Sequence, residues 1–133
     1  MLLNGILLNS EAWHGVTKLQ IKELDKNYEN LICRILKAHS KTPLEFLYLE
    51  SGTISIKWIL AQRRVNYLKT ILEKDKNELV RKALEAQKLN PTNSDFVKLV
   101  EQDMLDLGTT HEEITCKNKV ELREGFKKKT LNL

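Results

Sequence analysis

The strongest constraint on the fold is a helix-capping signal that occurs four times along the chain. In each copy a Thr or Asp is followed three residues later by Glu or Gln, and apolar residues with helical spacing come next. The first side chain of such a capping box accepts from an amide of the first helical turn, and the second reaches back to the cap's own N–H. Four helix starts in 133 residues predict a multi-helix protein. The four pairs are Thr17 with Gln20, Thr42 with Glu45, Asp75 with Glu78, and Thr110 with Glu113.

The spacing of the apolar residues predicts where the helices run. We expect a single-domain, all-α bundle of about six helices with orthogonal or irregular packing. Gly52 suits the left-handed cap that ends the shortest of these helices. Residues 1–116 are expected to form the bundle, and 117–133 a basic C-terminal helix or tail that frays. The segments expected to be helical are 2–14, 17–38, 43–50, 54–74, 76–88, 95–107 and a final stretch from 110.

The composition fits one soluble domain. The chain is 41% apolar and 30% charged, and five Gly and two Pro supply few of the turns that an all-β chain needs. Cys33 and Cys116 lie far apart without metal-ligand spacing, which favours a reducing compartment. The apolar start of the chain is stopped by Asn9 and Glu11, well short of the roughly 20 residues of a membrane span. We therefore expect a nuclear or cytoplasmic, intracellular protein with no signal peptide, no transmembrane segment and no membrane partner.

The net charge of +4 conceals a segregation of charge along the chain. Lys and Arg number 3 against 4 Asp and Glu in residues 1–33, and 12 against 6 in residues 34–88. The same counts are 1 against 6 in residues 89–116 and 6 against 2 in residues 117–133. A cationic block beside an acidic block indicates either contact with an anionic polymer or an internal pairing of the two blocks.

The longest predicted helix is apolar over most of its circumference, which is typical of a helix at the centre of a bundle. Arg63 projects among its isoleucines, so we expect Arg63 to form an internal ion pair, with Glu45 or Glu50, because an uncompensated buried guanidinium is costly. Lys57 and Arg64 share the boundary between two apolar faces. These two cations are candidates to contact a phosphate backbone.

The best anion site in the sequence is the run His39-Ser40-Lys41-Thr42, just before Pro43. Here the free amides of a helix N-terminus, a hydroxyl group and a lysine converge, the arrangement that holds a phosphate. The same residues also serve as a plain capped helix start that needs no ligand. Both interpretations remain open from the sequence alone.

The chain carries no catalytic motif. His14, His39 and His111 lie on separate predicted elements, and there is no HExxH, Gly-rich phosphate loop or GxSxG. The acidic pair Glu112-Glu113 belongs to a solvated helix. We therefore expect a protein that is not an enzyme and that holds no metal ion and no cofactor.

About residues 1–115 contain several short packing and capping motifs. They are Ser10-Glu11-Ala12-Trp13, Ala38 to Pro43 with Glu45, Leu47 to Glu50 with Gly52, Arg63-Arg64 with Tyr67-Leu68, and Gln87, Pro91 and Asp95-Phe96. Together they resemble the region downstream of the reverse transcriptase palm in animal non-long-terminal-repeat retrotransposon polyproteins. His14, Ser55 and Phe96 stand where that family often has Tyr, Pro and Trp, and the polymerase's metal-binding aspartate motif is absent.

The resemblance implies a thumb or connector segment that contacts the template–primer backbone and packs on the polymerase core. Two hypotheses follow. In the first, the chain is a helical module that binds the backbone of an RNA–DNA or DNA duplex without reading its sequence. In the second, it is a helical interaction module that pairs with itself or with another protein. The cations assigned to backbone contact are Lys37, Lys41, Lys57, Arg64, Lys127, Lys128 and Lys129.

Overall fold

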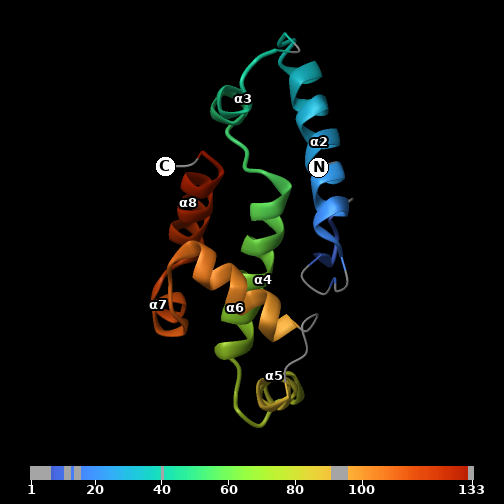
Figure 1. Ribbon diagram of the computed structural model, residues 1–133. Coiled ribbons are helices and arrows are strands. Elements are labelled where there is room, and N and C mark those ends of the chain that lie inside the picture. The colour runs from blue at the N-terminus through green and yellow to red at the C-terminus, as the bar shows by residue number, and fades with distance from the viewer. Residues whose placement is uncertain (1–6, 11–12, 14–15, 40, 91–95, 132–133) are drawn as a thin grey trace.

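The computed structural model describes residues 7–10, 13, 16–39, 41–90 and 96–131 (Figure 1). These residues form seven α-helices and contain no strand, which confirms the predicted all-α class. None of the described helices combines the length and the apolar character of a membrane-spanning segment. The helices are α2 (Lys18–Ile35), α3 (Leu44–Ser51), α4 (Ile56–Leu72), α5 (Leu79–Leu89), α6 (Phe96–Leu107), α7 (His111–Cys116) and α8 (Lys119–Thr130).

Helix α4 is the centre of the fold, as its nearly all-round apolar surface predicts. It contacts α2, α5, α6, α7 and α8. In Figure 1, α2 and α8 run along two sides of α4, and α6 crosses it. Helices α3 and α5 lie at opposite ends of the molecule.

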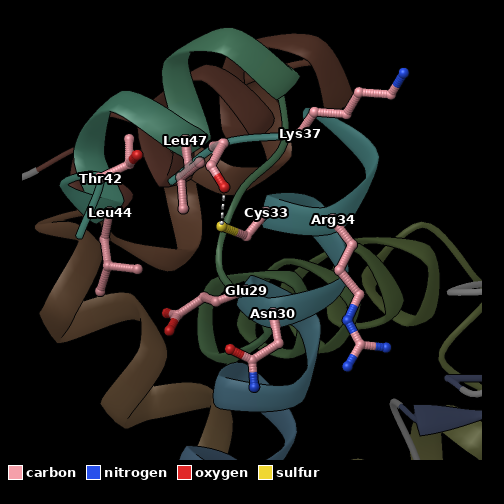
Figure 2. Close-up of a pocket in the computed structure, with 9 residues that line it drawn as sticks. Glu29, Asn30, Cys33, Arg34, Lys37, Thr42, Leu44 and Leu47 are labelled. Carbon is pink, nitrogen blue, oxygen red and sulfur yellow. Dashed lines mark hydrogen bonds between the residues drawn. The ribbon is translucent and has the colours of Figure 1, made fainter. Parts of the chain in front are cut away.

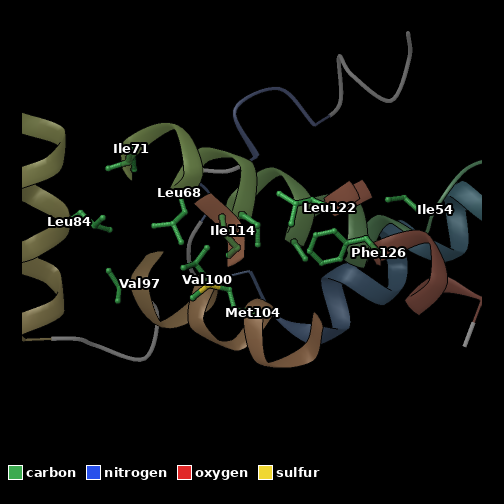
Figure 3. Close-up of a cluster of buried hydrophobic side chains, with 12 residues drawn as sticks. Ile54, Leu68, Ile71, Leu84, Val97, Val100, Met104, Ile114, Leu122 and Phe126 are labelled. Carbon is green, nitrogen blue, oxygen red and sulfur yellow. The ribbon is translucent and has the colours of Figure 1, made fainter. Parts of the chain in front are cut away.

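The main hydrophobic core joins α4 to the C-terminal half of the chain (Figure 3). Val65 and Leu68 of α4 are fully buried, and they share this core with Val100 of α6, Ile114 of α7 and Phe126 of α8. Two smaller clusters lie on the side of α2. The first contains Leu7, Ile56 and Leu60, and the second contains Ile32, Leu47 and Tyr48.

Two of the four predicted capping signals act as caps. Thr17 and Gln20 form both hydrogen bonds of the capping box at the start of α2. The Thr110 hydroxyl accepts from the amide of Glu113, but the Glu113 carboxylate accepts from the Thr109 hydroxyl instead of from the cap's backbone.

The other two signals do not cap helices. Helix α3 begins after Pro43, so Thr42 lies one residue too early. The Asp75 carboxylate accepts from the amide of Asn77, two residues on, and this local turn delays α5 until Leu79. A box that the prediction missed, Asn118 with Glu121, starts α8.

The predicted helix over 2–14 is wrong in the part that can be compared. Leu7 to Ser10 form a turn in which Asn9 adopts a left-handed conformation, and residues 1–6, 11–12 and 14–15 lie outside the described residues. Leu7 is nevertheless fully buried, against Ile56 and Leu60 of α4.

Residues 117–133 were predicted to form a basic C-terminal helix or a tail that frays, and the structure forms the helix over Lys119–Thr130. Helix α8 packs along α4, and its Leu122 and Phe126 are among the most buried side chains. The Phe126 ring lies 6.0 Å from the Trp58 ring, centroid to centroid. Leu122 and Phe126 are four residues apart, a spacing typical of a packed helix. The prediction of fraying gave more weight to the three lysines that follow them than to this spacing.

Helix α4 is capped from another helix. Its own cap residue, Ser55, makes no side-chain cap hydrogen bond, whereas the Asp25 carboxylate of α2 accepts from the amide of Ile56 at 2.6 Å. Burial raises the pKa of Asp25, and the amides of Ile56 and Lys57 partly oppose that rise. The contact fixes where α4 begins against α2.

Truncation of Phe126 tests whether α8 is part of the core. Phe126→Ala should lower the free energy of unfolding by about 3–5 kcal/mol, because it leaves a cavity in a fully buried site. The matched control is Val120→Ala, which changes a residue of the same helix that is 69% exposed and should alter stability by less than about 0.5 kcal/mol. Equal effects of the two changes in urea titrations would contradict the packing of α8.

The Asp25 cap should be visible in the pH dependence of stability. Because its folded pKa is raised, the folded chain binds a proton at Asp25 more readily than the unfolded chain does. The contribution of this carboxyl to stability therefore falls as pH rises through its folded pKa. Asp25→Asn keeps an acceptor for Ile56, so its melting temperature relative to the parent should rise between about pH 4 and pH 7.

Glu113→Gln is the opposite control for this measurement. The Thr109 hydroxyl and then Lys117 lower the pKa of Glu113, so its stabilising effect is present at neutral pH and is lost as pH falls. Relative to the parent, this variant should become less stable as pH rises. A shared trend of the two variants would contradict the role assigned to Asp25.

Candidate nucleic-acid interface

Helix α3 lies between the C-terminal end of α2 and the C-terminal end of α8, at one end of the molecule (Figure 1). Leu131, just after α8, packs against the cluster of Ile32, Leu47 and Tyr48. The Tyr48 hydroxyl donates to the Glu29 carboxylate at 2.8 Å and so joins α3 to α2. Burial and then this hydrogen bond raise the pKa of Tyr48, which keeps the hydroxyl protonated as the donor.

This end of the molecule carries cations from three parts of the sequence. We call them the basic end, and all are exposed except Lys127, which is half-buried. None forms an ion pair with another residue that the structure describes. The members of the basic end are Arg34, Lys37, Lys41, Lys127, Lys128 and Lys129.

Lys37 occupies a position that usually belongs to glycine. Its φ is 51°, and the amides of Lys37 and Ala38 donate to the carbonyls of Arg34 and Cys33. These two hydrogen bonds make the Schellman motif that ends α2. A left-handed conformation costs a residue with a Cβ atom about 1 kcal/mol. The chain therefore keeps a lysine where glycine would be more stable.

A groove of about 550 Å³ separates the end of α2 from α3. Leu44 and Leu47 of α3 line one side, and Cys33, whose thiol donates to the Ala38 carbonyl at 3.4 Å, lies opposite them (Figure 2). Arg34 and Lys37 also line the groove, but their charged ends extend away from it. Glu29, Asn30 and Thr42 also line the groove, so its wall is mixed polar and apolar and includes one carboxylate.

The predicted phosphate site before α3 is not formed as expected. The amide of Lys41 donates to Nδ1 of His39 at 3.2 Å, and the amide of Thr42 donates to the His39 carbonyl at 2.9 Å. These contacts within the loop use two amides of the predicted cradle, and Thr42 is not the helix cap. Ser40 lies outside the described residues. Only the Lys41 side chain remains as a cation for the interface.

Arg64 is not available as a backbone-contacting cation, which corrects its assignment. Its Nε lies 2.6 Å from Oδ2 of Asp103, and its second terminal nitrogen lies 3.0 Å from Oδ1. The two side chains are only 13% and 9% exposed. This bidentate pair links α4 to α6 inside the core, so Arg64 is a structural residue.

Arg63 has a different environment from the one predicted. Its guanidinium donates to the Leu7 carbonyl and approaches the Ser10 hydroxyl at 3.4 Å. The expected partners Glu45 and Glu50 are both exposed on α3. Arg63 therefore attaches the N-terminal turn to α4, a contact that no helical wheel could reveal.

Lys57 is exposed on the first turn of α4. Its Nζ lies over the Trp58 ring, 4.5 Å from the ring centroid, in a cation–π contact. The predicted partnership of Lys57 and Arg64 on one phosphate-binding boundary is wrong, because Arg64 is committed to Asp103.

Sequence reasoning missed Arg34 as a member of the basic end. It lies in the last turn of α2, three residues before Lys37, which follows the end of that helix. That spacing was visible in the sequence. The proximity of α8 was not, because only the packing of Leu131 brings the tail lysines to α3.

The part of the chain that the structure describes contains no group of three or more His, Cys, Asp or Glu side chains placed to bind a metal ion. Compared with protein-family models, with curated proteins and with solved structures, the chain shows no match.

The Arg64–Asp103 pair can be tested by removing one partner. Arg64→Ala should lower the free energy of unfolding by about 3–5 kcal/mol, because it leaves the Asp103 carboxylate buried without a counter-charge. Lys74→Ala, which removes an exposed pair with Glu78, should cost no more than about 0.5 kcal/mol. The double change Arg64→Met with Asp103→Leu should recover much of the loss. If Arg64→Ala unfolds at the same urea concentration as the parent, the pair is not structural.

Proposed function

We propose that the chain is a non-catalytic helical module that contacts the sugar–phosphate backbone of an RNA–DNA or DNA duplex. The role matches that of a thumb or connector segment of a retroelement reverse transcriptase, which the sequence resembles. The observation that supports the proposal is the packing of Leu131, which follows the three lysines of α8, against Ile32 of α2, because it puts those lysines at the same end of the fold as Arg34, Lys37 and Lys41. Long, exposed lysines suit phosphate oxygens and position a duplex without reading bases.

The conformation of Lys37 supports the same function. A lysine in the left-handed position lowers stability, and strained residues of this kind gather at binding sites. The three lysines of the last turn of α8 are favoured there by the negative end of the helix dipole. They nevertheless stay free of ion pairs among the described residues, so their charge is available to a ligand.

A second candidate function, an interaction or self-association module, is favoured by the outer side of α3. Phe46 is 54% exposed and Leu49 is 60% exposed, and the two side chains are three residues apart on the same face. Neighbouring exposed apolar residues of this size are typical of protein-binding surfaces. Such a surface also suits a segment that packs on a polymerase core.

The slope of log affinity against log salt concentration tests the proposed function. Lys127, Lys128 and Lys129 changed together to Gln should flatten this slope on a DNA duplex by about 2.7, since each lost phosphate contact reduces it by about 0.9. The matched control changes Lys74, Lys76 and Lys82 to Gln near α5, at the opposite end, and removes the same charge. An equal flattening by both variants would mean that net charge alone acts, and the basic end would not be the interface.

Lys37→Gly separates binding from stability in the same assay. Glycine relieves the left-handed strain, so the melting temperature should rise while duplex affinity falls. Absence of duplex binding at low salt, together with association that depends on protein concentration and is lost in Phe46→Ser, would favour the interaction module instead.

A further inference from the structure

The groove between the end of α2 and α3 is not explained by the proposed function. Leu44 and Leu47 supply the apolar part of its wall (Figure 2), and a sugar–phosphate backbone gains little from contact with leucines. The charged residues of the wall are two cations, Arg34 and Lys37, and one carboxylate, Glu29. A partner that suits this groove therefore presents an apolar side chain with more negative than positive charge beside it.

The outer face of α6 has this arrangement. Leu105 is 75% exposed, and it lies four residues after Glu101 and directly before Asp106. Residues 98, 101, 102 and 105 are exposed on one side of the helix, because their spacing of three and four residues matches the helical repeat, and Asp106 lies at the edge of that side. The face carries two carboxylates and one cation, Lys98, whereas the groove carries two cations and one carboxylate. The two surfaces are therefore complementary in charge.

The charges that would meet are not neutralised within the chain. Glu101 and Asp106 form no ion pair with another residue that the structure describes, and the Asp106 carboxylate accepts from the neutral amide of Gln102 at 3.0 Å. Arg34 and Lys37 are likewise outside every ion pair among the described residues. Their charged ends are exposed beside the groove, where a partner seated in it would meet them. Contact between the two surfaces therefore forms new ion pairs without breaking existing ones.

We propose that α6 of a second copy of this chain docks in the groove between α2 and α3, with Leu105 as its apolar anchor. In Figure 1, α6 lies away from the groove of its own chain, so the contact joins two copies. The contact is heterologous, because the groove and the α6 face are different surfaces, and it continues from copy to copy unless the rotation closes a ring. This inference goes beyond the proposed function. A docked α6 covers Arg34 and Lys37, so association and duplex binding compete for these two cations.

Sedimentation velocity of the full chain, over a wide range of protein concentrations, tests the contact. The parent should form species larger than a dimer as its concentration rises, and less so at about 500 mM than at about 50 mM salt, because salt screens exposed charges. Leu105→Ser should weaken the association roughly 10- to 100-fold, the worth of one buried leucine. The matched control, Leu79→Ser, makes the same change at a residue of α5 that is 81% exposed, and it should leave the association unchanged.

Mixing two variants tests which surfaces meet. Leu105→Ser loses the anchor and keeps the groove, whereas Arg34→Glu with Lys37→Glu reverses the cations of the groove and keeps the α6 face. Each variant alone should stay monomeric at concentrations where the parent associates. The mixture should form a 1:1 dimer and nothing larger, because only one docking contact is then possible. All three substituted residues are exposed, so the variants should keep the circular dichroism spectrum and melting curve of the folded parent.

Three results would overturn the proposal. One is a parent that stays monomeric at every concentration, and another is a mixture of the two variants that forms no dimer. The third is association that survives Leu105→Ser and is lost in Phe46→Ser, because the outer side of α3 is then the interface. No duplex is present in these measurements, so their outcome does not depend on the proposed function. Leu105→Ser keeps every cation of the basic end, and its duplex binding therefore tests that function separately.

Discussion

The ion pair between Arg64 and Asp103 is the contact on which the rest of the fold depends. It joins α4 to α6 within a core that is otherwise made of apolar side chains, and each charge is largely withdrawn from water. Neither residue could remain there without the other, because a lone buried charge costs more than the pair does. The bidentate geometry also accepts little displacement. Apolar contacts tolerate sliding, so this pair sets the register in which α6 crosses α4.

The position of the basic end follows from the same central helix. Helix α4 offers apolar surface on several sides, and α2 covers one of them while α8 covers another. Both helices end beside α3, where Leu131 completes the cluster of Ile32, Leu47 and Tyr48. Cations far apart in the chain are thus brought together by burial of apolar side chains elsewhere.

The sequence predicted features set by neighbouring residues, such as the central helix, and missed contacts between residues remote in the chain. The wheel of α4 identified the central helix because burial on all sides leaves a pattern within one segment. It assigned Arg63 to an internal ion pair and Arg64 to backbone contact, because the partner that buries Arg64, Asp103, is remote in the chain and leaves no mark on the wheel. The predicted start of α5 was wrong for a local reason. The Asp75 side chain can either cap a helix or close a turn, and here it closes a turn. The box at Asn118 followed the same rule as Thr17 and was available from the sequence.

Part of the segregated charge is paired internally, which is one of the two alternatives that the sequence left open. Arg64 of the basic block pairs with Asp103 of the acidic block, and Lys117 of the tail pairs with Glu113, so part of the segregation is neutralised internally. Pairing of this kind reaches only those cations whose helices pack against α6 or α7. Helix α3 and the end of α8 extend past both helices. At that end α3 itself carries Glu45 and Glu50, and Glu29 lines the groove with Arg34 and Lys37. The six cations of the basic end outnumber the three carboxylates Glu29, Glu45 and Glu50 there, and this excess is the positive charge that the proposed anionic partner would meet.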